Sequence, residues 1–373
     1  MNNNFLSHFE SLKDTRMNRR KLHPLKNIIA MTIVAVMGDC NTWNDIFIFA
    51  HLKKNFFSRF LDLSNGIPSV HTFRRVFQSL DPKQLETCLT KWAQSIFKDV
   101  DNEIISIDGK TICQASKMND GGNIHLVSAW ASENEITLGQ VKTEIKSNEI
   151  TAIPELLNVI DYQNAIITID AMGCQKNIAF QIAAKGQYVL ALKENHPTLY
   201  QDVIRSFKTK KANDIYEEID YGHGRLEKRK CSVINDLDYL LDKENWQNLQ
   251  SIVKIDSERI IKKTGEIQQF TRYYISSLTD AKLISKAIRQ HWGVENKLHW
   301  CLDIIFNEDY SSKRIGYSAQ NFAIINKIVL NVLRKDRERS NVKGHPLFYV
   351  SLRSRRKIAG WDDDYLMSLL SLI

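Results

Sequence analysis

Three acidic residues have the local settings expected of a site for divalent cations. Asp108 follows the largely apolar run 104–107, and Asp170 follows the run 166–169, so each is predicted at the end of a buried strand. Glu295 lies in a stretch, 291–300, that is predicted to be helical. Carboxylates at strand ends point into the crevice where the loops of an open α/β sheet gather. Together the three could converge on hard cations, which bind oxygen ligands and leave positions for phosphate and water.

Such a site suits the cutting and joining of phosphodiester bonds. In a two-metal mechanism one ion activates water or a 3′-hydroxyl, and the other stabilises the leaving oxygen. We expect Asp108 to bridge both ions, Asp170 to bind one and Glu295 the other. A ligand set made only of carboxylates favours two Mg²⁺ or Mn²⁺ ions over zinc. The alternative for an Asp at a strand end is a turn or a helix cap.

The helix that carries Glu295 leaves two other interpretations open. His291, Glu295 and His299 are four residues apart and would share one helical face, which could indicate a zinc site. Their spacing is not H-E-x-x-H, and the one cysteine close by is Cys301. Asp303, about two turns after Glu295, is a second candidate for the third acidic residue.

Basic and amide side chains near these acids fit the handling of phosphate. Lys110 alternates back to the same side of an extended chain as Asp108. Each such residue alone is typical of a solvated surface, but grouped around three carboxylates they predict contacts to a DNA backbone. Trp292 and Trp300 are expected to pack in the core rather than stack on an unpaired base. The predicted DNA-binding residues are Lys110, Lys193, Asn195, Arg225, Arg229, Asn296 and Lys297.

The elements that must position these residues follow from the apolar periodicity. Antiparallel strands are expected first, and helices then alternate with strands, which is the order of a ribonuclease-H-like α/β (α+β) core but also fits other α/β folds. The predicted strands are 104–107, 125–131, 137–145, 165–169 and 188–192, with helices at 150–160 and 175–184 between the later ones.

The whole chain divides into three regions. Residues 1–98 are predicted to form an N-terminal helical domain, in which Ser69 can cap a helix. Residues 99–340 are expected to form the catalytic domain, with a charged, β-rich insertion at about 205–275. The helix that carries Glu295 should begin near Asp280, and another helix is expected over 318–333. Residues 341–373 form a basic C-terminal segment.

The composition of the chain limits which binding partners and which cellular compartment are expected. There are 51 Lys and Arg against 43 Asp and Glu, a net charge of +8. Cations gather near the C-terminus, where we expect them to neutralise phosphate. The six cysteines form no CxxC pair, which favours a reducing cytoplasm. The N-terminus lacks a secretory pattern, and the apolar stretch 28–37 is too short to span a bilayer, so no membrane is expected. The C-terminal cations include Arg334, Lys335, Arg337, Arg339, Arg353, Arg355, Arg356 and Lys357.

Several segments in order along the chain resemble the DDE transposases of bacterial insertion sequences, most closely the H-repeat-associated branch. The matching segments are 106–111, 168–175, 188–197, 222–229 and 291–309, together with N-terminal blocks at 8–69 and 73–77. The wider clan places Arg four residues before its last carboxylate and Lys seven after it, where this chain has His291 and Leu302. The contacts of that Arg and Lys are therefore not carried over.

The resemblance implies a protein that binds the ends of a mobile element in double-stranded DNA. It implies metal-dependent strand cleavage and strand transfer through Asp108, Asp170 and Glu295, with a homodimer on paired ends. Two alternatives stay open. One is a stand-alone ribonuclease-H-like nuclease without end recognition, and the other is a catalytically inactive DNA-binding relic.

Overall fold

Nine strands form one mixed sheet in the order β3-β2-β1-β4-β5-β9-β8-β7-β6. This computed structural model describes residues 4–17, 21–98, 100–113, 124–143, 149–222 and 224–373. The strands are β1 (Ile104–Ile112), β2 (Ile124–Ala131), β3 (Ile136–Lys142), β4 (Ile166–Ile169), β5 (Gln187–Leu192), β6 (Asp214–Gly222), β7 (Arg225–Ile234), β8 (Ser251–Ile261) and β9 (Ile267–Ser276).

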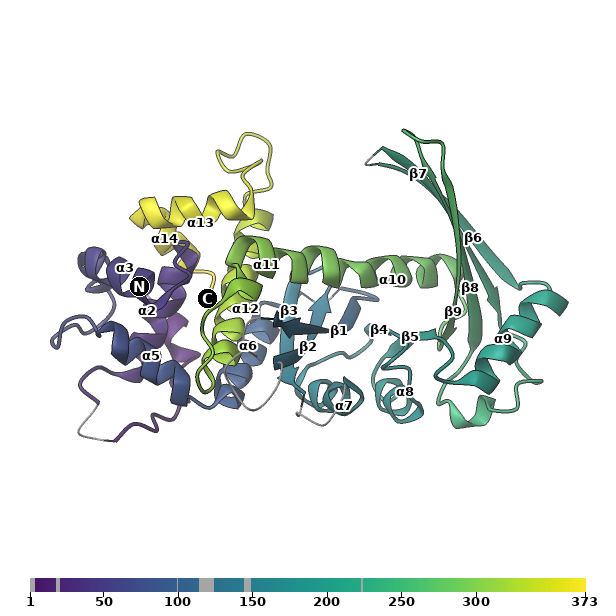
Figure 1. Ribbon diagram of the computed structural model, residues 1–373, viewed down its shortest axis with the longest axis horizontal. Helices are drawn as coiled ribbons and strands as arrows, with labels where there is room; N and C mark the ends of the chain where they lie inside the picture. Colours follow the sequence, from purple (N-terminus) through teal and green to yellow (C-terminus); the bar gives the residue numbers. More distant parts are fainter. Residues whose placement is uncertain (1–3, 18–20, 99, 114–123, 144–148, 223) are drawn as a thin grey trace.

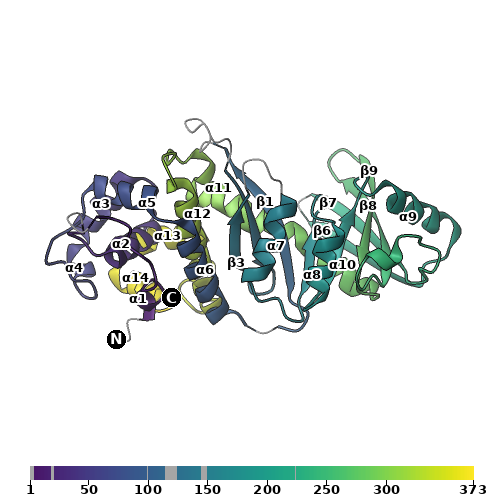
Figure 2. The same cartoon turned by 90° about the horizontal axis from the view of Figure 1, so that it is seen from below.

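The first five strands have the ribonuclease-H-like arrangement. β1, β2 and β3 are antiparallel neighbours, whereas β4 and β5 run parallel to β1. Helices α7 (Glu149–Val159) and α8 (Lys176–Ala183) cover one face of this core. The other face carries α10 (Ala281–Gly293), the π-helical turn η4 (Val294–His299) and α11 (Trp300–Phe306), which continue one another (Figures 1 and 2). The predicted fold class is confirmed.

Alternation along the strands decides which side chains meet which layer. Ile105 and Ile107 of β1 pack with Ile167 and Ile169 of β4 in the core shared with α7 and α8. Their neighbours, including Ser106 between them, point to the face under α10, because successive side chains of a strand point to opposite faces.

Strand β1 is longer than the apolar pattern predicted. The expected strand ended at Ile107, but pairing with β2 continues from Asp108 through Ile112. Residues 108–111 are half-buried and mostly polar, so hydrophobicity alone did not mark them as strand. The predicted strand 137–145 is observed as β3, and its last two residues lie outside the described part of the chain.

The predicted insertion extends the core sheet instead of standing apart from it. β9 pairs antiparallel with β5, and β8, β7 and β6 follow outward. In Figure 1 these four strands rise as a curved wall at the end of α10. Helix α9 (Pro197–Thr209), which the sequence analysis did not predict, packs against β9 with Pro197 in its first turn, where a missing N–H costs nothing.

Helices from both ends of the chain share one hydrophobic core. Helix α12 (Ser318–Arg339) contacts α2 (Leu25–Met37), α5 (Val70–Ser79) and α6 (Pro82–Ile96) on one side and β3 on the other. Helices α13 (Leu352–Trp361) and α14 (Asp363–Leu370) pack on α2. No described helix is both long enough and apolar enough to cross a bilayer. The helices are α1 (Asn4–Ser7), α2 (Leu25–Met37), α3 (Trp43–Leu52), α4 (Lys54–Phe57), α5 (Val70–Ser79), α6 (Pro82–Ile96), α12 (Ser318–Arg339), α13 (Leu352–Trp361) and α14 (Asp363–Leu370), with short turns η3 (Lys243–Asn245) and η5 (Glu308–Tyr310).

Buried amide side chains attach α12 to β3 and to the end of α5. The side chain of Asn331 accepts from the Thr137 N–H and donates to the Thr137 carbonyl of β3, both at 2.9 Å. Asn321 donates to the Phe77 and Leu80 carbonyls at the end of α5. These contacts complete backbone groups that would otherwise be buried without partners.

The expectation that the C-terminal cations neutralise phosphate is wrong for three arginines. Arg334, Arg355 and Arg356 are buried, at 4%, 0% and 0% exposure. Arg355 pairs with the buried Asp336, and Arg356 donates to the Val36 carbonyl at the end of α2. Carbonyls in the last turn of a helix lack intrahelical partners, so these guanidinium groups bind backbone and carboxylate within the fold.

Lys313 lies between Asn41 and Phe322 of α12, and we expect it to make the stability of the fold depend on pH. Its ammonium donates to the Asn41 carbonyl and lies 3.6 Å from the centre of the Phe322 ring. Burial lowers the pKa of Lys313 to about 8. Between pH 8 and the usual lysine pKa of about 10.4, the unfolded chain holds a proton that the folded chain has lost, so stability should rise with pH.

We therefore expect Lys313→Met to remove this pH dependence. Urea unfolding of both proteins at pH 8 and pH 10 isolates the lysine, because other groups cancel in the comparison. Relative to the variant, the wild type should gain up to about 1.4 kcal/mol per pH unit in this window. A stability difference that stays constant with pH would show that Lys313 is not perturbed.

Candidate active site

A buried chain of hydrogen bonds lies beneath the three predicted acids. The Thr168 hydroxyl of β4 donates to Ser106 Oγ of β1 at 3.1 Å and lies 2.9 Å from His291 Nδ1 of α10. Ser106 and Thr168 are register partners, each two residues before an acid and on the same face of its strand. His291 lies about one turn before Glu295. This chain of hydrogen bonds therefore places the carriers of all three acids together.

The backbone after β4 also orients Asp170. Its Oδ1 accepts from the Met172 and Gly173 N–H groups at 3.0 and 3.2 Å. The Asn195 amide donates to the Ala171 carbonyl at 2.6 Å, so Asn195 holds the same loop from the end of β5. This is a turn of the kind that Asp residues favour, and it leaves Oδ2 outside these two backbone hydrogen bonds.

The acids lie close enough to affect one another. Burial raises the pKa of Asp108 to about 7, and the negative charges of Glu149, Asp170 and Glu295 act in the same direction. Burial and the charge of Glu149 also raise the pKa of Asp170, against its two backbone hydrogen bonds. Glu295 is exposed on η4. Like charges gathered in a partly buried site favour the uptake of a cation.

The two histidines on this helix do not compensate that charge. Burial lowers the pKa of His291 to about 4 and that of His299 to about 3, so both imidazoles are neutral at physiological pH. His299 Nδ1 lies 3.6 Å from Asp108 Oδ2, whereas His291 contacts Thr168. The zinc interpretation gains no support, because the two rings have different partners.

Glu149 is a fourth carboxylate that the sequence analysis missed. It begins α7, and its Oε1 lies 2.7 Å from His125 Nε2. No periodicity or motif in the sequence marks it. Only the packing of α7 on the sheet brings it toward Asp108.

Lys110 pairs with two carboxylates other than the three predicted acids. Its ammonium lies 2.7 Å from Asp303 and 2.8 Å from Asp309, and its side chain is only 10% exposed. The competing assignment of Asp303 as the third acid is therefore weakened, because Asp303 is engaged with Lys110. Lys193 is placed differently, since its positive charge acts on Asp170.

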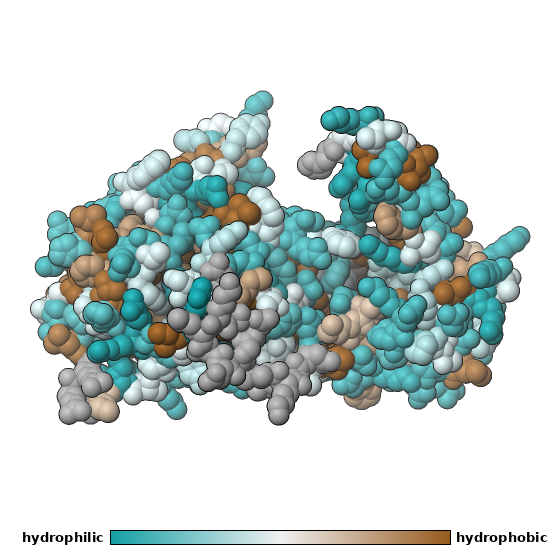
Figure 3. Space-filling view, in the orientation of Figure 1, coloured by the Kyte–Doolittle hydropathy of each residue, from teal (hydrophilic) through white to brown (hydrophobic). Residues whose placement is uncertain are grey.

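The curved wall presents arginines toward α10. A cleft of about 370 Å³ is lined from β7 by Arg225 and Arg229, from β8 by Arg259 and from β9 by Arg272. Glu227 is the one acidic side chain among the described residues that line it. In the view of Figure 3 the surface is hollowed between this wall and the C-terminal helices, and its rim is mostly hydrophilic.

The expectation that Trp292 and Trp300 pack in the core is wrong. They are 40% and 55% exposed, because both point away from the helix face that packs on the sheet. Trp292 lines the arginine cleft, with the Arg272 guanidinium 5.0 Å from the centre of its ring. It precedes Glu295 by three residues, so the cleft and the acid lie on neighbouring parts of one helix surface.

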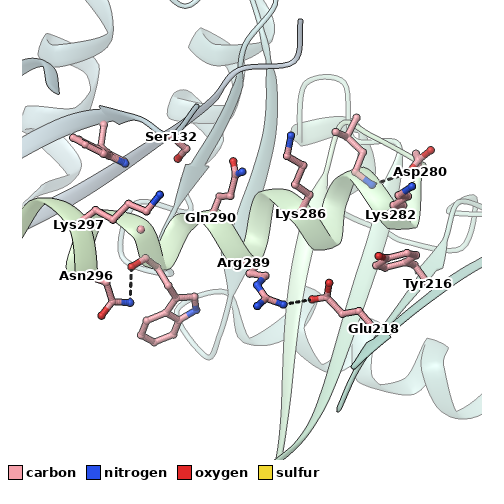
Figure 4. Close-up of a pocket in the computed structure, with 14 residues that line it drawn as sticks. Ser132, Tyr216, Glu218, Asp280, Lys282, Lys286, Arg289, Gln290, Asn296 and Lys297 are labelled. Carbon is pink, nitrogen blue, oxygen red and sulfur yellow. Dashed lines mark hydrogen bonds and ion pairs between the residues drawn. The ribbon is translucent and has the colours of Figure 1, made fainter. Parts of the chain in front are cut away.

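A larger cleft, of about 750 Å³, lies along another flank of α10 (Figure 4). Lys286 and Lys297 line it, but they pair with Glu133 and Glu135 of the β2–β3 turn at 2.7 Å. Asn296 borders both clefts, and its amide donates to the Trp292 carbonyl. Neither Asp108 nor Asp170 lines the larger cleft, so size alone does not identify the reactive site.

The acidic cluster fits a hard divalent cation by its chemistry. Asp108, Asp170 and Glu295 offer carboxylate oxygens, which such ions prefer. Among the described residues, no three His, Cys, Asp or Glu side chains are arranged to hold a metal ion. The acids thus lie within electrostatic range of one another without the geometry of a closed metal cluster.

Comparisons with known proteins agree along the chain. A family model described as "Transposase DDE domain" matches residues 95–332, and one described as "DDE_Tnp_1-associated" matches residues 6–93. The "H repeat-associated putative transposase YhhI" of Escherichia coli K12 is 36% identical over 376 residues, covering 98% of this chain and 97% of the relative.

The "Putative transposase YncI" of Escherichia coli O157:H7 is 39% identical, covering 95% of this chain and 91% of the relative. A cryo-EM structure of the piggyBac transposase synaptic complex with hairpin DNA aligns with a TM-score of 0.43 and 11% identity, over 93% of this chain and 72% of that one. The family model and these relatives span most of the sequence, and the chain belongs to the transposase DDE domain family.

Proposed function

We propose that this protein is an active DNA transposase that cleaves the ends of an insertion sequence and joins them to a target. The observation that supports the proposal is the hydrogen-bond chain of Ser106, Thr168 and His291, which joins β1, β4 and α10 two to four residues before Asp108, Asp170 and Glu295. Burial raises the pKa of Asp108, the charges of Asp170 and Glu295 act in the same direction, and burial keeps the imidazoles of His291 and His299 neutral. Membership of the family supports the same interpretation.

The reaction would proceed in two displacements at phosphorus. Water attacks the phosphodiester at the element end, a P–O bond breaks, and the element keeps a 3′-hydroxyl. That hydroxyl then attacks a target phosphodiester, forming a new P–O bond and releasing a target 3′-hydroxyl. Asp108, Asp170 and Glu295 would hold two Mg²⁺ or Mn²⁺ ions, which when bound supply activation of the attacking oxygen and stabilisation of the leaving one.

The arginine cleft is the proposed binding surface for the DNA backbone. Arginine presents a planar fork of donors that matches phosphate, and four of them line the wall beside α10. Lys193 would meet phosphate next to Asp170. Trp292, exposed and adjacent to the cleft, is suited to stack on a base that has left the duplex.

Partners and compartment follow from the same proposal. The substrate would be double-stranded DNA, with element ends and target bound in turn, and paired ends would be held by a homodimer. The six cysteines, all among the described residues, form no disulfide, which fits a reducing cytoplasm.

The first test asks whether DNA cleavage depends on a divalent metal ion and on each of the three acids. Cleavage of a duplex that carries the sequences flanking the coding region should stop with EDTA and return with Mg²⁺ or Mn²⁺. Asp108→Asn, Asp170→Asn and Glu295→Gln keep side-chain shape but remove ligand charge, so each should lower cleavage by several orders of magnitude. All three should stay folded and bind DNA.

Asp303→Asn is the control, because it removes a carboxylate on the same run of helix that pairs with Lys110. It should retain substantial activity. Rescue by zinc alone, or an active Glu295→Gln beside an inactive Asp303→Asn, would contradict the assignment. Cleavage of any duplex without joining would indicate the nuclease instead, and binding without cleavage the inactive relic.

The second test concerns the arginine cleft. Neighbouring residues of β7 point to opposite faces, so Arg225 and Arg229 face the cleft while Lys228 and Lys230 do not line it. With duplex DNA, Arg225→Ala combined with Arg272→Ala should weaken binding. The slope of log K against log salt should also fall by about one for each phosphate that the variant no longer neutralises. The measurement is fluorescence anisotropy between roughly 50 and 200 mM salt.

Lys228→Ala combined with Lys230→Ala removes the same charge from the same sheet and serves as the control. It should change the slope less. Equal effects of the two pairs would mean that net charge, and not the cleft, governs binding.

A further inference from the structure

The carboxylate of Glu149 and the ring of His125 lie directly against Gly109, the residue after Asp108. A Cβ at Gly109 would be 2.0 Å from Glu149 Oε1 and 2.3 Å from His125 Nε2. Real Cβ atoms do not approach other atoms so closely. The Asp–Gly sequence thus leaves room for a second acid beside Asp108.

Hydrogen bonds fix this acid from β1 and β2. His125 Nε2 lies 2.7 Å from Glu149 Oε1, and His125 Nδ1 lies 2.8 Å from the Thr111 hydroxyl. A carboxylate can only accept, so Nε2 donates to Glu149, and the hydroxyl can donate to Nδ1 when the ring is neutral. Thr111 and His125 are register partners, which holds the ring in place.

Glu149 reaches the acids from the α7 side of the sheet. Gly109 faces that side, because it alternates with Asp108. The pairing of β1 with β4 ends at Ile107 and Ile169, so no neighbouring strand separates Glu149 from the ends of these two strands. In keeping with this, the negative charge of Glu149 acts on Asp108 and also on Asp170, more strongly than the charge of any other carboxylate.

We propose that Glu149 is a fourth acidic residue of the site and helps to hold the divalent cation. His125 is its positioning residue, and Gly109 is a glycine because any larger residue would displace the pair. The inference rests on the proposed function, since it assigns a further residue to the cation site of that reaction. It adds negative charge on the side of Asp108 opposite α10.

The test is Mn²⁺ binding to the full chain without DNA, measured by isothermal titration calorimetry. Glu149→Gln keeps the acceptor for His125 but loses the charge, and it should weaken Mn²⁺ binding by about tenfold or more. Gly109→Ala should weaken it similarly by displacing the carboxylate, and His125→Phe should weaken it by leaving Glu149 unsupported. Thermal unfolding midpoints of these variants should stay near that of the wild type.

Glu155→Gln is the matched control, because Glu155 lies on the same helix but is exposed and pairs with Lys83. It should bind Mn²⁺ as the wild type does. If Glu149→Gln fails to fold, Glu149→Asp keeps the charge but withdraws it by one methylene, and should weaken binding to a smaller extent.

The outcomes separate this inference from the proposed function. If Asp108→Asn loses Mn²⁺ binding while Glu149→Gln binds normally, the role of Glu149 is overturned and the cation site stands. If the wild type binds no Mn²⁺, the cation site as a whole is overturned, and Glu149 with it.

Discussion

The hydrogen-bond chain of Ser106, Thr168 and His291 is the contact on which the rest of the site depends. Buried polar groups must find partners, so these three fix which face of α10 lies on β1 and β4. Each acid then follows its anchor along the chain, by two residues for Asp108 and Asp170 and by about one helical turn for Glu295. His291 stands where the wider clan has an arginine, and in this chain that position orients the helix.

Electrostatics then determines what the assembled site can do. The histidines beside the acids are neutral because burial lowers the pKa of each ring. Lys110, the nearest lysine in sequence to Asp108, is held by Asp303 and Asp309. Burial raises the pKa of Asp108, and the like charges of Glu149, Asp170 and Glu295 act in the same direction. A divalent cation would relieve this repulsion.

The sequence predicted the parts of the fold that depend on local patterns. Apolar runs marked the core strands, and Asp280, expected near the start of the helix that carries Glu295, does cap α10 by accepting from the Leu283 N–H. The sequence did not predict contacts between segments that are distant along the chain. Glu149 joins the acids only because α7 packs on the sheet, and Trp292 is exposed because the opposite side of its helix is buried. Arg356 resembles a solvent-exposed cation in sequence, yet it satisfies a carbonyl at the end of α2.

The basic side chains of this positively charged protein thus have different roles in the structure. Buried arginines bind helix ends and carboxylates, and two exposed lysines, Lys286 of α10 and Lys297 of η4, pair with acids of the β2–β3 turn. Arginines are also concentrated on one face of the wall, where Arg229 and Arg259 pair with Glu227, and alternation along each strand separates this face from the lysines of the other. The wall meets α10 at Trp292, within one turn of Glu295. A polyanion bound along that face would therefore lie beside the acids, because the same helix forms the floor of the cleft and carries the third carboxylate.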